Sequence, residues 1–235
     1  MKNYFLSAMI MLFAATTFGQ YFASPVEGFS RKKPSYVTLK SGEELVGTIK
    51  DLDFKRGLID EITLVVGKKD KRKLTPDMIS HAYLPESGLN KMGKALDFAY
   101  DATQWGSDDI NQEYMTDGYA YFEQSTVTLK KKKIEALLQM INPAFNNPVK
   151  IFHDPWAKES ASVGVGGIQV AGGLEKSYWV IIGDEPAFKI KKKEYKDSIS
   201  KIFGSCPDYI SKIGDGPKWA DFPEALFNYS KECKK

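Results

Sequence analysis

The fold begins in the stretch Tyr36-Val-Thr-Leu-Lys-Ser-Gly-Glu-Glu-Leu-Val-Gly-Thr-Ile-Lys50, where apolar and polar residues alternate around a Ser-Gly turn. A period of two with β-branched residues predicts two strands joined as a β-hairpin. A three-residue loop ending at Gly42 pairs Val37 with Leu45 and keeps the odd-numbered apolar residues on one face, whereas a two-residue loop separates them. Gly42 then takes the left-handed conformation that ends such a loop.

Three more strand patterns follow the hairpin. They cover Glu61–Val66, Lys71–Leu74 and His81–Leu84, and Thr75–Ile79 between the last two has the pattern of one helical turn. Gly47 lies on the inward face, where a missing side chain predicts a bend or a close backbone approach. Five short strands with tight turns predict a small, strongly bent β-barrel over residues 36–85.

Residues 1–20 have the pattern of a secretory signal peptide. Lys2 provides the positive start, Tyr4–Phe18 is an apolar run, and small residues precede a cleavage point after Gly19 or Gln20. No stretch reaches the roughly 20 apolar residues that a membrane span requires. We therefore predict a periplasmic or secreted protein without a membrane span.

The rest of the chain predicts an α+β protein, in which a mixed sheet with amphipathic helices and a C-terminal helical segment follows the barrel-like unit. Residues 21–35 form an extended or loose lead-in, residues 86–118 a linker, and residues 119–235 a mixed α+β domain. The linker combines an amphipathic helix, Asn90–Gln104, with an acidic surface loop, Gly106–Gly118.

Several elements are expected within residues 119–235. Ile134, Leu137, Leu138 and Ile141 have helical spacing, and Asn142-Pro143 ends that helix. The expected strands are Tyr119–Leu129, Val149–His153 and Ala187–Lys191, together with a Gly-rich hairpin that joins Ser162–Ala171 to Ser177–Ile182. Three helices follow these strands. Pro207 opens the second helix and Asp221 caps the third.

The composition is that of an ordinary globular protein, with 43% hydrophobic residues and a net charge of +3 over 235 residues. Charge therefore implicates neither nucleic acid nor an acidic membrane. Lysine-rich runs at Lys68–Lys73, Lys130–Lys133 and Lys189–Lys193 are typical of solvated strand and helix ends. Together they could instead form an anion-binding face.

Known catalytic and cofactor patterns fail on inspection. The Gly-rich stretch 162–173 lacks the following helix and the Gly-Lys-Ser/Thr that phosphate binding needs. Asp109–Glu113 starts like a calcium loop, but Tyr114 and Ala120 stand where Gly and Glu are required. Only two histidines, His81 and His153, are present, and zinc needs more ligands. We predict no cofactor, no metal site and no catalytic residues.

Cys206 and Cys233 are the only cysteines, and export favours their oxidation to a disulfide. Cys206 precedes the helix that Pro207 opens. Cys233 follows Tyr229 by four residues, so it shares the apolar stripe of the last helix. The bridge would pin the end of the last helix to the start of the preceding one.

Two resemblances accompany these patterns. Val37, Leu39, Gly42, Leu45, Gly47, Ile49 and Asp53 are similar to the first segment of Sm-like small barrels, which implies barrel geometry over about 30 residues; the second, RNA-contacting segment is not evident. The mature chain as a whole resembles a group of uncharacterised secreted proteins of Bacteroidetes-type bacteria. The carrying features are the Tyr36–Ile49 opening, Leu74–Ile79, Leu137–Pro143, Lys176–Trp179, Phe203–Pro207 and Cys233.

The resemblance implies a compartment and a fold, and no activity. Our first hypothesis is a secreted, non-catalytic binding or envelope-associated protein whose partner is an envelope protein or an anionic ligand. Its motivation is exposed strand aromatics, Tyr119 and Tyr121, together with the lysine runs. The alternative is a secreted hydrolase whose carboxylates gather in a cleft; the candidates are Asp97, Asp101, Asp108, Asp109 and Asp117.

Overall fold

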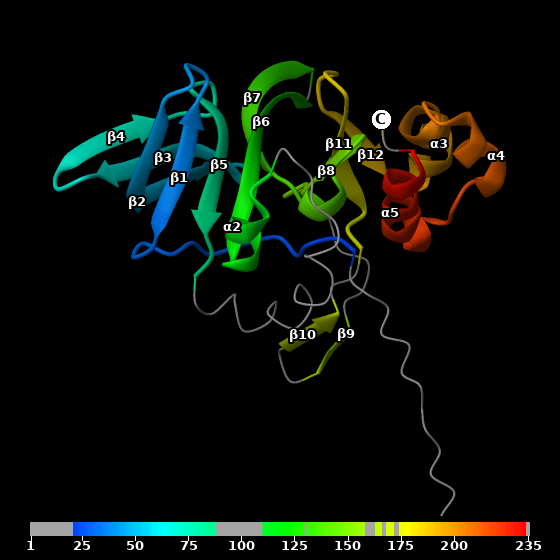
Figure 1. The fold of residues 1–235 in the computed structure, drawn as a ribbon, viewed down its shortest axis with the longest axis horizontal. Coiled ribbons are helices and arrows are strands. Elements are labelled where there is room, and N and C mark those ends of the chain that lie inside the picture. Colours follow the sequence, from blue (N-terminus) through cyan, green and yellow to red (C-terminus); the bar gives the residue numbers. More distant parts are fainter. Residues whose placement is uncertain are drawn as a thin grey trace, which may run out of the picture.

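The structure, a computed structural model, describes residues 21–87, 110–129, 131–157, 163–165, 168–171 and 174–233. The predicted signal peptide, the helix expected at Asn90–Gln104 and the carboxylates Asp97, Asp101, Asp108 and Asp109 lie outside these ranges. Within them the fold is α+β, as predicted, with a closed antiparallel barrel, a second sheet and a helical C-terminal segment (Figure 1).

Six strands close the barrel and a seventh extends it. They are β1 (Pro34–Leu39), β2 (Glu44–Lys55), β3 (Leu58–Val66), β4 (Asp70–Leu74), β5 (Ile79–Pro85), β6 (Tyr119–Leu129) and β7 (Lys132–Gln139). The order is β2-β1-β5-β6-β7-β3, β2 and β3 pair to close it, and β4 is added beside β3. The apolar residues on the inner faces form one buried cluster, which includes Val37, Leu45, Leu64 and Phe122.

The hairpin has the predicted register. Val37 pairs with Leu45, and Gly42 has a φ of +88° in a loop closed by the bond from its N–H to the Leu39 carbonyl. Gly47 is also explained, because a Cβ at this position would lie 2.6 Å from the carbonyl oxygen of Val65 on β3. The close backbone approach predicted from the missing side chain is therefore confirmed.

The helix expected around Leu137 and Leu138 is wrong, because this stretch is strand β7. It pairs with β6 from Phe122–Gln139 to Leu129–Lys132. Leu137 points into the barrel and Leu138 points outward, yet both are buried. A strand that is buried on both faces loses the polar–apolar alternation that would identify it. β6 and β7 also complete the barrel, so the barrel extends beyond the predicted residues 36–85 into the predicted 119–235 domain.

A three-stranded sheet packs against the outer wall of the barrel. It has the order β12 (Phe188–Lys191), β11 (Ser177–Ile182), β8 (Val149–Phe152). The expected hairpin between Ser162–Ala171 and Ser177–Ile182 is wrong, since β9 (Val163–Val165) pairs with β10 (Ile168–Ala171) and β11 lies between β8 and β12. Phe152, Trp179 and Ile181 on one face of this sheet contribute to the cluster beside the barrel.

The other face of the three-stranded sheet is covered by helices (Figure 1). These are α3 (Tyr195–Phe203), α4 (Pro207–Ile213) and α5 (Phe222–Glu232), with short 3-10 turns η1 (Pro143–Phe145), η2 (Lys192–Glu194) and η3 (Trp219–Asp221). Asp221 occupies the predicted N-cap position of α5, but its side chain makes no capping bond. No helix in the described ranges is long and apolar enough to cross a membrane.

Two expectations for connecting segments need correction. Part of the acidic stretch expected to be a loop forms helix α2 (Gln112–Thr116), since the Asn111 side chain accepts hydrogen bonds from the N–H groups of Glu113 and Tyr114 as an N-cap.

The lead-in is extended but not loose. Phe22 is buried among the C-terminal helices, and the Ser30 N–H donates to the Pro85 carbonyl of the barrel, so this segment joins both ends of the molecule (Figure 1).

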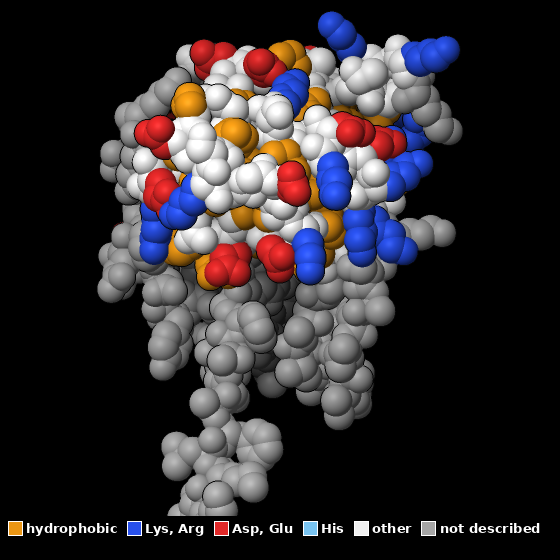
Figure 2. Space-filling model, turned by 90° about the vertical axis from the view of Figure 1, so that its right-hand side faces the viewer, with side chains coloured by type: hydrophobic (Ala, Val, Ile, Leu, Met, Phe, Trp, Pro, Cys, Tyr) orange, Lys and Arg blue, Asp and Glu red, His pale blue; other side chains and the backbone are white. Residues whose placement is uncertain are grey.

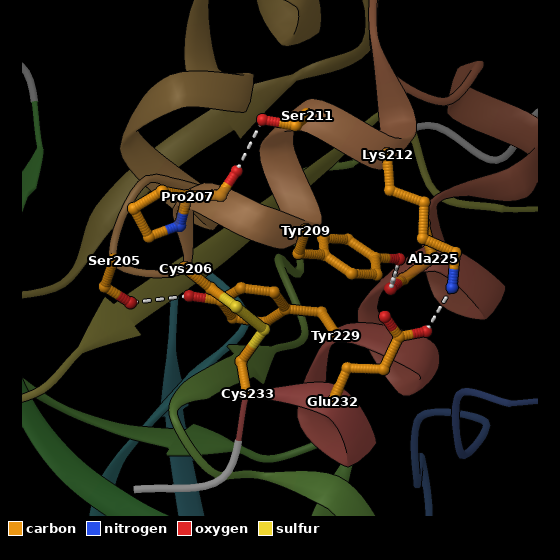
Figure 3. Close-up of a disulfide and its surroundings, with 10 residues drawn as sticks. All are labelled: Ser205, Cys206, Pro207, Tyr209, Ser211, Lys212, Ala225, Tyr229, Glu232 and Cys233. Atoms are coloured by element: carbon orange, nitrogen blue, oxygen red, sulfur yellow. Dashed lines mark hydrogen bonds and ion pairs between the residues drawn. A yellow bond between two sulfur atoms is a disulfide. The ribbon is translucent and has the colours of Figure 1, made fainter.

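Cys206 and Cys233 form the predicted disulfide, which joins the start of α4 to the end of α5 (Figure 3). Around it, the hydroxyls of Ser205 and Tyr229 hydrogen-bond at 2.6 Å, and the Tyr209 hydroxyl donates to the Ala225 carbonyl at 2.6 Å. The bridge therefore reinforces an interface between α4 and α5 that aromatic packing and hydrogen bonds already define.

The two barrel glycines give a paired prediction. Gly42→Ala should lower the free energy of unfolding by about 1 kcal/mol, since only backbone strain opposes it and no atom lies within 4 Å of the new Cβ. Gly47→Ala should cost up to about 3 kcal/mol, because the β3 backbone must move. Urea denaturation measures both. Gly42→Asn is the control, and equal losses for Gly42→Ala and Gly42→Asn would contradict the left-handed conformation.

Removing the disulfide should destabilise the protein. The bridge spans a sequence separation of 27 residues, for which the chain-entropy model gives roughly 3–4 kcal/mol. The double variant Cys206→Ser/Cys233→Ser should lose this amount in urea denaturation, and reductant should reproduce the loss in the wild type but not in the variant. Two titratable thiols in unfolded, unreduced protein taken from its native compartment would contradict the prediction.

Candidate functional site: a charge-paired junction beside an exposed tryptophan

Five polar side chains meet where β8 ends beside β11 and β12. We call the set His153, Asp154, Glu175, Ser177 and Lys189 the polar junction. The chain turns sharply after β8, because the Ala157 N–H donates to the Asp154 carbonyl at 2.8 Å and the Trp156 N–H donates to the Asp154 side chain at 3.3 Å. An aspartate before proline is a typical turn former.

His153 and Glu175 form one half of the polar junction. The Nδ1 atom of His153 contacts the Oε1 atom of Glu175, and the Oε2 atom accepts the Asp154 N–H at 3.3 Å. The backbone of Glu175 is also held, by the Tyr178 hydroxyl and by the Trp219 indole N–H, each at 3.0 Å. Burial raises the pKa of the Glu175 carboxyl above its usual range, and the bond to His153 opposes that rise.

Asp154, Lys189 and Ser177 form the other half. The Asp154 side chain is only 1% exposed, and its Oδ2 atom accepts from the Lys189 ammonium at 2.7 Å and from the Ser177 hydroxyl. The ammonium also lies 4.7 Å from the ring centre of Trp179 and 5.2 Å from that of Trp156. Two indoles and a buried carboxylate thus enclose a single cation.

The barrel contacts this region at two places. The His153 N–H donates to the carbonyl of Gln139 at the end of β7 at 2.9 Å, and the turn between β2 and β3 packs against Pro155. A Cβ on Gly57, in the turn between β2 and β3, would lie 2.8 Å from the Cβ of Pro155, and the φ of Gly57 is +76°. Only glycine therefore allows this turn to pack against the Asp154–Trp156 segment, which fixes the segment between the barrel and the three-stranded sheet.

The chemistry available to the polar junction is limited. An imidazole oriented by a carboxylate is the usual arrangement of a general base. The nearby hydroxyl of Ser177, however, donates to Asp154 rather than to His153. Within the described ranges, no group of three or more His, Cys, Asp or Glu side chains could hold a metal ion. The arrangement offers hydrogen bonds and an aromatic ring rather than an activated nucleophile.

The lysine runs Lys68–Lys73 and Lys189–Lys193 do not gather on one face. Arg72 pairs with Asp70 and Lys73 with Glu61 on the barrel side, whereas Lys189 pairs with Asp154 and Lys191 with Glu194 at the opposite end. Figure 1 places β4 and β12, which carry two of the runs, far apart. On the helical end of the molecule, acidic and basic side chains are interspersed (Figure 2).

The aromatic strand residues that motivated a binding surface are buried. Tyr119 and Tyr121 point out of the barrel but are covered, with 6% and 5% of their surfaces accessible. Tyr114 of α2 and Tyr36 of β1 pack against Tyr119, and burial together with the charge of Tyr36 raises the pKa of Tyr119 to about 12. The prediction that these rings are exposed is wrong, because outward from a barrel is not outward from the molecule.

The remaining predicted residues are separate from the polar junction. His81 on β5 is half-buried, and burial lowers its pKa, while Glu123 on the paired strand opposes this. Of the five carboxylates in the hydrolase hypothesis, only Asp117 falls in the described ranges, where it is exposed at the end of α2. The described residues thus supply one member of that carboxylate set.

The sequence suggests His153 only as a zinc ligand or as the partner of a cysteine nucleophile, and Lys189 only as part of a lysine run; it gives no role to Glu175. The run His153-Asp-Pro-Trp156 was the available signal, since Asp-Pro is typical of a turn, which brings the polar residues before it close to the aromatic ring after it. Glu175 lies 22 residues from His153 in sequence, so no local spacing could pair them.

Comparisons with known proteins give no match, whether the chain is scanned against family models or searched against curated proteins and solved structures.

Breaking the buried ion pair should be costly. Lys189→Met leaves the Asp154 carboxylate buried without its cation, and we expect a loss of about 3–5 kcal/mol in the free energy of unfolding. The double variant Asp154→Asn/Lys189→Met should recover much of this loss. Arg72→Met, which breaks an exposed pair with Asp70, is the matched control and should cost less than about 1 kcal/mol. Equal losses for Lys189→Met and Arg72→Met would contradict the view that the Asp154–Lys189 pair is buried and costly to break.

Proposed function

We propose that this protein is exported and acts as a non-catalytic binding protein at the bacterial envelope. The observation that carries the proposal is the disulfide between Cys206 and Cys233, which are the only cysteines of the chain. Structural disulfides form and persist in oxidising compartments. The signal-peptide pattern of residues 1–20 and the resemblance to secreted proteins of Bacteroidetes-type bacteria support the same compartment.

A binding role is supported by the fixed positions of the side chains in the polar junction. The Lys189 ammonium is paired with the Asp154 carboxylate, the Glu175 carboxyl contacts the His153 imidazole, and the groups are fixed by several hydrogen bonds. Fixed groups and a fixed aromatic ring lose little conformational entropy on binding, which favours recognition. The hydroxyl that could serve as a nucleophile is engaged by Asp154.

The alternative function, a secreted hydrolase, has one observation in its favour. His153 contacts a buried carboxylate, as the general base of a hydrolase does. Chromogenic ester, phosphate and glycoside substrates test this alternative. Turnover that is abolished in His153→Gln, with folding retained, would establish the hydrolase and overturn the non-catalytic proposal.

Export is tested directly by fractionating cells and sequencing the N-terminus of the protein. We expect the chain in the periplasmic or extracellular fraction, beginning at Gln20 or Tyr21, with no reactive thiol after unfolding without reductant. Replacing Leu6 and Met9 by Asp in the apolar run should retain the protein in the cytoplasm, whereas the same changes at Lys68 and Lys69, which are exposed in the turn between β3 and β4, serve as the control. Wild-type protein that stays in the cytoplasm with Met1 intact would contradict the proposal.

A further inference from the structure

One large aromatic ring next to the polar junction is exposed and held in place. Trp156 is 37% exposed, and the other large apolar residues with comparable exposure in the described ranges are Val46, Phe54 and Met78. Pro155 and the two hydrogen bonds to Asp154 fix the backbone of Trp156. The Lys189 ammonium lies against the ring at 5.2 Å from its centre.

The charges around Trp156 narrow the chemistry of a ligand. Lys189 is paired with Asp154, and the Glu175 carboxyl contacts the imidazole of His153, so the ammonium and both carboxyl groups already have partners. A cation already against the indole disfavours a second one on the same ring. Anions would have to compete with two carboxylates for their partners. A neutral ligand meets neither obstacle.

Hydrogen-bonding groups remain available at the rim of the ring. The side chains of His153 and Lys189 are 26% and 23% exposed. Imidazole has a second ring nitrogen besides the Nδ1 atom that contacts Glu175, and an ammonium has three donors. A planar apolar ring with donors and acceptors beside it is complementary to a molecule with one apolar face and several hydroxyl groups.

We propose that Trp156, with His153 and Lys189 beside it, binds a neutral saccharide unit. The C–H face of the sugar ring lies on the exposed indole, and sugar hydroxyls hydrogen-bond to the second ring nitrogen of His153 and to the ammonium of Lys189. This inference rests on the proposed binding function and specifies its ligand class as a neutral glycan.

The test uses the full folded protein and soluble neutral glycans as probes: cello-oligosaccharides, chito-oligosaccharides and mannan. Calorimetric titration should show saturable binding to at least one of them. Trp156→Ala should weaken that binding about tenfold or more, as truncation of a central aromatic contact does. Trp156→Phe, which keeps a smaller ring, should weaken it less. Met78→Ala, at an exposed apolar residue in the turn before β5, is the matched control and should leave binding unchanged.

A second measurement does not depend on a variant. Oxidative modification of tryptophan, followed by peptide mass spectrometry, should be slowed at Trp156 in the wild-type protein when the bound saccharide is added. Trp179 is buried and should stay unmodified with or without saccharide. If Trp156→Ala fails to fold, the protection of Trp156 in the wild-type protein still tests whether saccharide binds there.

Several results would overturn the inference. They are the absence of binding to all three neutral probes, binding that Trp156→Ala leaves unchanged, or binding only to heparin, an anionic glycan. In the first case Trp156 serves only to cover the Asp154–Lys189 pair, and Trp156→Ala then lowers stability alone. Export is measured separately by fractionation, so exported protein that ignores neutral saccharides refutes this inference and leaves the proposed compartment intact.

Discussion

The structure depends on the start of β6, Tyr119–Phe122, and the end of β7, Ala136–Gln139, being buried on both faces. Phe122 and Leu137 line the barrel, whereas Tyr121 and Leu138, one residue away in each strand, belong to the outer cluster that also contains Phe152, Trp179 and Ile181 of the three-stranded sheet. One pair of strands therefore belongs to two hydrophobic cores. Because a one-residue slip would exchange the two sets of side chains, the register of β6 against β7 fixes both the barrel closure and the position of the second sheet.

This double burial also sets how much the sequence could predict. The Val37–Leu45 register, the conformation of Gly42 and the alternation in Tyr119–Leu129 follow from local patterns, and these predictions are confirmed. The stretch around Leu137 gave a helical spacing because two adjacent leucines are buried on opposite faces, which erases the strand period. The burial of Tyr119 could not be predicted, since it depends on which distant element packs over the barrel wall.

The two ends of the described chain are tied to the same helical layer. Phe22 packs edge-on against Tyr178 and Phe222, and the lead-in continues from there to the barrel at Ser30. The disulfide at Cys233 holds the last helix against α4. The disulfide was predictable from two cysteines and an expected compartment. The packing of Phe22 was not, because the lead-in has no strand or helix period that would show which of its aromatic residues is buried.

The polar junction lies where these layers meet, and this location explains its composition. β8 ends between the barrel turn at Gly57 and the helical layer at Trp219, so its last polar groups cannot reach bulk water on every side. Buried polar groups must be paired, and the structure pairs each carboxylate with a cationic or imidazole partner from another strand or loop. Pairing neutralises the charges but also holds the turn rigid, which leaves Trp156 exposed in a fixed orientation. The same constraint that makes the junction stable therefore makes its one exposed ring suited to recognition.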